Sequence, residues 1–396
     1  MRAVPMTIVE GRTGWPVLIG RPNASTRGAL SLDIAELMVR SKQSGKAMCV
    51  LPPANGGDDP LLALTAQDVL RIESSGIPGW WLRTRWETAA AMQAASLRAS
   101  AASAVFWREI HKELRRHIGD ERLPYALRTR LRGMADRSID RSARASRDAA
   151  DRHRDRRLLR ESVTVVMPEP LEAAGRELAQ RNGVPLDRPF VALEIRSRRD
   201  ALHTAIDAVA ANGHAVVRVG RDDGVPIERA GVVNLTAQRS KLLSAFVLLR
   251  ARCLICETAD LQSVAYLTNT PCLRLNAIDP FEAYPIRRDG LFTLATPVDL
   301  RTGRELGLEE GMARHHVGHL DRYAHRPNRP VDVQGAVEEM LEVAAGVIAE
   351  TAGQAQYRLK LADAGQVLDQ HQPGRSNDDG FIGDGRLARV HAERMA

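Results

Sequence analysis

The stretch from Pro189 to Asn276 decides the fold, because it repeats short apolar runs separated by longer segments. The runs are FVALEI (190–195), AVVRVG (215–220), VVNL (232–235), CLIC (253–256) and PCLRLN (271–276). Apolar residues at helical spacing mark 202–210, a leucine-rich helix is expected over 240–251, and a third helix begins at 257–260. Short strands alternating with helices predict an α/β fold whose parallel sheet is covered by helices on both faces.

Polar residues follow the apolar runs at the points where the predicted strands end. In open parallel sheets the ligand crevice lies beyond the carboxyl ends of the strands. The candidate binding residues at these ends are Arg196, Arg198, Gly220, Glu257, Thr258, Asp260 and Asn276. Gln262 and Ser263 add polar groups on the first turn of the third helix. This placement predicts a binding site at one edge of the sheet.

A smaller α/β unit precedes the predicted sheet. Strands are expected at 15–20 and 47–51 with a helix over 30–42 between them, and a helix-like run follows at 61–70. A chain of 396 residues is too long for one ordinary core, so it is expected to divide into domains. The parts are an N-terminal α/β domain (1–80), a helical basic segment (81–160), a C-terminal Rossmann-like domain (161–350) and a tail (351–396) whose last helix, over 386–394, packs back on the N-terminal domain.

The composition is that of a globular chain without a membrane span. Apolar residues make up 44% of the sequence, and no run approaches the roughly 18 consecutive apolar residues that cross a bilayer. The N-terminus lacks the apolar core of a signal peptide, and four cysteines form no disulfide framework, so a cytoplasmic location is expected. Cys253 and Cys256 form a single C-x-x-C inside an apolar run, which favours core packing over zinc.

The net charge of +7 is concentrated in one segment. From Arg108 to Arg160 there are 17 Lys and Arg against 9 Asp and Glu, a net charge of +8, which leaves the rest of the chain at about −1. One hypothesis makes this segment an arm for an anionic surface or nucleic acid, and peripheral membrane contact stays open. The accompanying acids and the lack of interleaved aromatic residues disfavour nucleic acid.

Several strand ends resemble the motifs of a family of bacterial glycosyltransferases with a GT-B-like fold. In that family one strand ends in His-x-Arg, a second ends in Arg-x-Gly, a third meets a Thr-Ser-Gly turn, and a later strand ends in asparagine. The matching positions are 194–196, 218–220, 258–260 and 271–276. The order also resembles the nucleotide-sugar domain of heptosyltransferases. The resemblance covers residues 170–345 and implies two Rossmann-like domains of GT-B type, a nucleotide-sugar donor with no metal or other cofactor, and an unidentified acceptor, either a glycan or a small molecule.

The arginines at the strand ends are the best candidates for holding the donor's diphosphate, because charge-assisted hydrogen bonds to phosphate contribute about 1.5–3 kcal/mol each. The candidates are Arg196, Arg198, Arg199 and Arg218. The structural alternative is a surface cluster whose arginines pair with Glu194, Asp200 or Asp222.

The resemblance also implies contacts from Glu257, Thr258 and Asp260 to ribose or phosphate, whereas the structural alternative makes Thr258 or Asp260 the N-cap of the following helix. Glycosyl transfer without a metal needs a base for the acceptor hydroxyl. In the family it comes from the N-terminal domain, where the available acids are Asp33, Asp58 and Asp59. We take Asp33 as the predicted base.

Two positions depart from the family pattern. Glu194 stands where the family commonly has histidine, and Asp260 replaces the small residue that lets a phosphate approach backbone amides. An acid near a helix N-terminus suits the helix dipole but repels a diphosphate. These departures favour a second hypothesis, a catalytically inactive relative that keeps the fold as a binding or scaffold module.

Other signals for catalysis are weak or missing. The histidines at 315, 316 and 319 have spacing that could gather a metal, but flanking glycines favour a polar loop. The sequence contains no P-loop and no dinucleotide-binding fingerprint. The leading hypothesis is therefore a metal-independent glycosyltransferase that moves a sugar from a nucleotide-sugar to an unknown acceptor.

Overall fold

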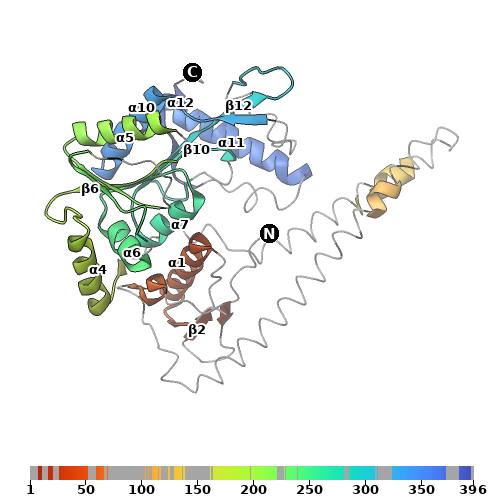
Figure 1. The fold of residues 1–396 in the computed structure, drawn as a ribbon. Coiled ribbons are helices and arrows are strands. Elements are labelled where there is room, and N and C mark those ends of the chain that lie inside the picture. The colour runs from red at the N-terminus through yellow and green to blue at the C-terminus, as the bar shows by residue number, and fades with distance from the viewer. Residues whose placement is uncertain are drawn as a thin grey trace.

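A computed structural model describes most of the chain outside the basic segment (Figure 1). The described residues are 8–10, 17–20, 26–51, 59–66, 69, short pieces between 103 and 138, 161, 164–196, 198–220, 227, 229–238, 240–280, 285–307, 310, 323–371 and 383–393. In the basic segment 109–114 and 129–135 are helical, as expected. Outside the described residues lie 139–160, Asp58, Asp222 and the three histidines at 315, 316 and 319.

A seven-stranded sheet forms the centre of the molecule, in the order β14-β11-β10-β9-β6-β7-β8. Every neighbouring pair is parallel. The prediction of a parallel sheet is confirmed. The apolar runs in the sequence are nearly continuous because these strands are buried on both faces. The strands are β6 Phe190–Glu194, β7 Ala215–Arg218, β8 Val232–Asn234, β9 Leu254–Cys256, β10 Cys272–Ala277, β11 Gly290–Leu294 and β14 Arg386–Leu387.

Helices cover both faces of this sheet, because successive strand residues point to opposite sides. In β6, Val191 and Leu193 belong to the core shared with α5 (Arg199–Ala211) and α10 (Pro330–Ala344). The intervening Ala192 packs into the core on the other face. The helices on that face are α4 Glu169–Arg181, α6 Lys241–Arg250 and α7 Ala259–Thr268.

The N-terminal unit is built on this second helical layer. Its sheet has the order β1-β2-β3, with β1 Ile8–Glu10 antiparallel to β2 Val17–Gly20 and β2 parallel to β3 Ala47–Val50. Helix α1 (Arg27–Ser44) packs along α7, and its buried residues join the same core cluster as those of α6 and α7. The expected strand-helix-strand unit is therefore confirmed, but one apolar core runs through it and the large sheet.

The chain between the two sheets differs from the expectation of a helix over 61–70. Pro60–Ala63 forms a 3-10 turn, capped by the Asp59 carboxylate, which accepts from the Leu61 amide at 3.1 Å. Strand β4 (Thr65–Ala66) follows at once and pairs antiparallel with β5 (Val165–Val166). The helix is interrupted because Thr65 and Ala66 satisfy their backbone groups in this ladder.

The C-terminal tail stays with the large sheet, so the expectation that its last helix packs back on the N-terminal domain is wrong. Strand β14 pairs with β11, and the short α12 (Arg389–Ala392) packs on α10 and on an unexpected long helix, α11 (Ala352–His371). The buried Glu339 of α10 is the cause: its carboxylate accepts from the Arg389 amide at 2.6 Å and from the side chain of Gln354 at 2.8 Å.

After Asn276 the chain forms β11 and an antiparallel hairpin of β12 (Thr296–Asp299) and β13 (Tyr323–Arg326). Helix α10 begins at Pro330, because proline is well suited to the first helical position. Among the described helices, none is long and apolar enough to cross a membrane.

We expect Gly28→Ala to destabilise the protein by about 1–3 kcal/mol, the usual cost of overpacking. A methyl group on Gly28 would meet the Oδ1 of Asp260 at 2.6 Å and its Cα at 2.9 Å, which forces α1 away from α7. Urea unfolding measures the effect. Gly133→Ala, where the methyl group meets only a flexible arginine at 3.8 Å, is the matched control. An equal or smaller loss in Gly28→Ala than in the control would contradict the tight α1–α7 contact.

Candidate functional site

The predicted site residues do gather at the carboxyl edge of the large sheet, where they form a hydrogen-bonded chain. The Arg196 amide donates to Glu257 Oε2 at 2.7 Å, and Glu257 Oε1 accepts from Asn276 Nδ2 at 2.6 Å. These bonds link the ends of β6, β9 and β10. Glu257 and Asn276 therefore hold the strand ends together, a pairing that no pattern in the sequence indicated.

Asn276 extends the chain to the C-terminal elements. Its backbone has a left-handed φ of 56°, and its Oδ1 accepts from the Asn328 amide at 2.7 Å. The buried Asn328 accepts from the hydroxyl of Thr293 at 2.5 Å and donates to the Leu294 carbonyl at 2.7 Å. Its Nδ2 also lies 3.4 Å from Nε2 of His391. One polar network thus runs from β6 to α12.

Glu194, at the end of β6, lies at the other end of this network. Its Oε2 accepts from the backbone amides of Glu257 at 3.0 Å and Thr258 at 3.2 Å, and from the Thr258 hydroxyl at 3.2 Å. Its Oε1 forms an ion pair with Nε of Arg196 at 2.7 Å. Only 3% of Glu194 is exposed. The carboxylate therefore accepts the hydrogen bonds that the β9–α7 turn can donate, at the place where the resemblance implies a ligand phosphate.

Gly220 makes room for this carboxylate. Its φ of 97° is a conformation that side chains rarely adopt, and a Cβ there would lie 2.8 Å from Cγ of Glu194. The predicted role of Gly220 was in ligand binding, but the contact in the structure is with the protein's own Glu194 and Arg196.

Asp260 makes a comparable contact with α1. Its Oδ1 accepts from the Gly28 amide at 2.9 Å, in the first turn of α1, so it caps a helix 232 residues away instead of its own. Thr258 stands at the N-cap position of α7, as the structural alternative proposed, but its side chain makes no capping hydrogen bond. Nearby, Asp59 lies 3.7 Å from Arg27 and 3.6 Å from Lys241. Burial lowers the pKa of Arg27, while Asp59 and Asp260 oppose the shift.

The remaining predicted residues lie in varied surroundings. Asp33 is 1% exposed in α1, and Arg218 is 2% exposed at the end of β7. Gln262 bonds to Tyr266 and Arg274, and the Ser263 hydroxyl donates to its own helix at Ala259. Arg198 forms an ion pair with Asp200, as the structural alternative proposed. Arg199 begins α5, where its Nε lies 3.4 Å from His203 Nε2.

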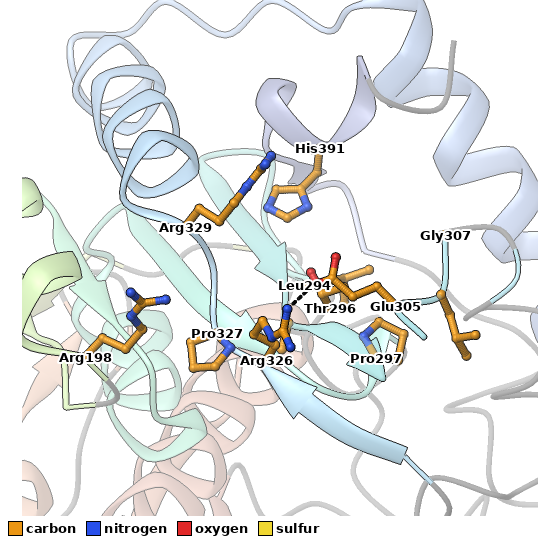
Figure 2. A pocket seen from close by; sticks show the side chains of 12 residues that line it. Arg198, Leu294, Thr296, Pro297, Glu305, Gly307, Arg326, Pro327, Arg329 and His391 are labelled. Atoms are coloured by element: carbon orange, nitrogen blue, oxygen red, sulfur yellow. Dashed lines mark hydrogen bonds and ion pairs between the residues drawn. The ribbon is translucent and has the colours of Figure 1, made fainter. Parts of the chain in front are cut away.

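A pocket of about 520 Å³ lies beyond the end of β11 (Figure 2). Three arginines reach it from three elements: Arg198 precedes α5, Arg326 ends β13 and Arg329 precedes α10. His391 of α12 lies beside Arg329 (Figure 2). The lining residues are Arg198, Leu294, Ala295, Thr296, Pro297, Glu305, Leu306, Gly307, Arg326, Pro327, Arg329 and His391.

The charges around the pocket favour an anion. Arg326 pairs with Glu305, and Arg329 Nε lies 3.2 Å from Asp332. A guanidinium group carries five N–H donors, so one carboxylate partner leaves donors for a ligand. Arg198 and Arg329 are also the N-cap residues of α5 and α10, which directs the positive ends of both helix dipoles to the rim.

Of the pocket-lining side chains that bear charge or titrate, only Arg198 was predicted. Arg326, Arg329 and His391 belong to segments read as an irregular loop and a tail. The one available signal was the Arg-Pro-Asn-Arg-Pro stretch at 326–330, directly before a strongly periodic helix.

In the described part of the chain, no group of three or more His, Cys, Asp or Glu could hold a metal ion. None of the four cysteines forms a disulfide and all are buried, which confirms the expectation of core packing for Cys253 and Cys256. Burial raises the pKa of the Cys253 thiol to about 12, so it is not a reactive thiolate.

The fold and the site together define an α/β protein with a parallel seven-stranded sheet. Hydrogen bonds join the strand ends at its carboxyl edge, and an arginine-lined pocket lies at one end. No protein-family model matches the sequence, and no curated protein matches it. Among solved structures, ADP-heptose LPS heptosyltransferase II from E. coli is similar over 84% of this chain and 99% of its own, with 12% identity and a TM-score of 0.40.

The stability of the protein should depend on pH through Glu194. Burial raises the pKa of its carboxyl group, and the ion pair with Arg196 and the bonds from the turn oppose the rise. A raised folded-state pKa contributes stability that is fully present below the unfolded value, about 4.3, and is lost as the pH rises through the folded value. The free energy of unfolding of the wild type, minus that of Glu194→Gln, should therefore fall as the pH rises above about 4.

Urea unfolding of both proteins across this pH range measures the difference. Glu177→Gln, on the exposed face of α4, is the control, because its carboxylate pairs with Arg181 in solvent. A difference for Glu194 that rises with pH, or one that stays flat as in the control, would show that burial does not dominate at this position.

Proposed function

We propose that the protein binds a nucleotide-sugar at the carboxyl edge of its large sheet and transfers the sugar to an unidentified acceptor. The observation that carries the proposal is the pocket with Arg198, Arg326 and Arg329, because it lies where open parallel sheets bind ligands. The resemblance of the strand-end motifs to glycosyltransferases supports the same substrate class.

The pocket supplies what a metal-free transfer needs at the leaving group. As the bond from the sugar to the diphosphate breaks, negative charge grows on the phosphate oxygens, and fixed cations stabilise that charge. Arg326 and Arg329 are held by Glu305 and Asp332, so little ordering is needed when the ligand binds. The apolar Leu294, Pro297 and Leu306 would contact the uncharged part of the ligand.

Glycosyl transfer also needs a base for the acceptor hydroxyl. Asp33 is almost fully buried in α1 and does not line the pocket. Glu305 and His391 are the lining residues whose side chains can act as a base. We propose one of these two in place of Asp33.

A second function, binding without catalysis, is favoured by a different observation. The chain's own carboxylates bond to backbone amides at both the β9–α7 turn and the start of α1, through Glu194 and Asp260. An enzyme that holds a diphosphate at this turn needs those donors. A non-catalytic relative does not.

Binding and turnover of nucleotide-sugars separate the two functions. We expect one class of nucleotide-sugar at about 100 times its Kd to stabilise the protein by about 2.7 kcal/mol, seen as a higher thermal midpoint. Arg326→Ala and Arg329→Ala should each weaken this binding by about tenfold or more, because each removes a charge-assisted contact. Arg181→Ala on α4, outside the pocket, is the matched control and should bind as the wild type does.

Release of the nucleoside diphosphate from the bound donor then decides between the functions. Release that is lost in Arg329→Ala supports the transferase. Binding without release in the presence of glycan acceptors supports the non-catalytic module. If no nucleotide-sugar shifts the midpoint of the folded protein, both functions at this pocket are wrong.

A further inference from the structure

We propose that Glu194 determines where the ligand's anionic group binds: its carboxylate substitutes for a phosphate at the β9–α7 turn, excludes anions from that turn and leaves the arginine pocket as the anion site. The inference concerns the same ligand as the proposed function and rests on it for the role of the pocket. The exclusion at the turn can be tested without any nucleotide-sugar.

The geometry of the turn is that of an occupied anion site. Three donors, two backbone amides and the Thr258 hydroxyl, converge on the single oxygen Oε2 of Glu194 within 3.0–3.2 Å. Anion sites on proteins are built from such convergent N–H and O–H donors. Here the anion belongs to the chain, so a ligand phosphate must displace it or bind elsewhere.

Displacement is unfavourable because Glu194 is held from several sides. Arg196 pairs with its other oxygen at 2.7 Å, and Gly220 lies close against its side chain. The carboxylate is attached to β6, so it competes with free phosphate as an intramolecular ligand at high effective concentration. If it swung away from Arg196 and the turn, it would also lose these partners in a nearly water-free place.

The surrounding charge disfavours a second anion at the same turn. Glu194 and Glu257 both have carboxylates bonded around the ends of β6 and β9, and Asp260 lies two residues after Thr258. The arginine pocket has the opposite balance of charge, with three guanidinium groups and the N-terminal ends of two helices at its rim. The polar network through Asn276 and Asn328 connects the β9–α7 turn with the arginine pocket, but the two remain separate sites.

The amide of Thr258 reports directly on the exclusion. We would label the full-length protein with ¹⁵N-threonine, identify the Thr258 peak by its loss in Thr258→Ser, and titrate inorganic phosphate. In the wild type the Thr258 peak should not move. In Glu194→Ala it should move saturably with added phosphate, because the two amides and the hydroxyl of the turn become available to the anion.

Glu194→Gln gives the matched test if Glu194→Ala unfolds, since it keeps the shape and removes the charge. Retained dispersion of the other threonine peaks verifies the fold of each variant. Movement of the Thr258 peak in the wild type would overturn the inference. A Thr258 peak that does not move in either variant, when both are folded, would also overturn it. Either result is distinct from a failure of the proposed function, which appears as the absence of nucleotide-sugar binding at Arg326 and Arg329.

Discussion

The carboxylate of Glu194 lies buried at the end of β6, and both of its oxygens are engaged by the protein. It joins β6 to the turn between β9 and α7, and it holds Arg196 at the same edge. From Arg196 the hydrogen bonds continue through Glu257 and Asn276 to Asn328 at the start of α10. Polar groups at the carboxyl ends of parallel strands need partners when they are buried, and here they are one another's partners.

A second carboxylate, that of Asp260, joins the N-terminal unit to this edge. It bonds to the first turn of α1, while the apolar side of α1 shares a core with α6 and α7. Around α1, α6 and α7 the two sheets therefore share one apolar core instead of facing each other across a polar gap. The arginine pocket, which we propose as the anion site, lies beyond β11, away from the turn that the sequence motifs had suggested.

The central strands could be predicted because strands buried on both faces appear as continuous apolar runs, as in FVALEI at 190–195. Strand β14 could not, since its two residues, Arg386 and Leu387, carry no such run and pair with β11 only in the folded chain. Helix α11 was missed because its residues follow no strong apolar period, and Gln354 anchors it through Glu339 instead.

The sequence predicted which polar residues gather at the carboxyl edge, but not the bonds between them. Strand ends indicate which edge carries the polar residues, so Arg196, Glu257 and Asn276 were placed correctly together. Which of them bond to one another depends on register and distance, which a sequence does not contain. The pocket combines Arg198 with His391, almost two hundred residues apart, and no local pattern links them.

A crystal structure with a bound nucleoside diphosphate would test the proposed binding mode. We predict that the phosphates lie beside Arg326 and Arg329, while the Glu194 carboxylate keeps its bonds to the amides of the β9–α7 turn. Phosphates bonded to the Glu257 and Thr258 amides, with Glu194 turned away, would contradict it.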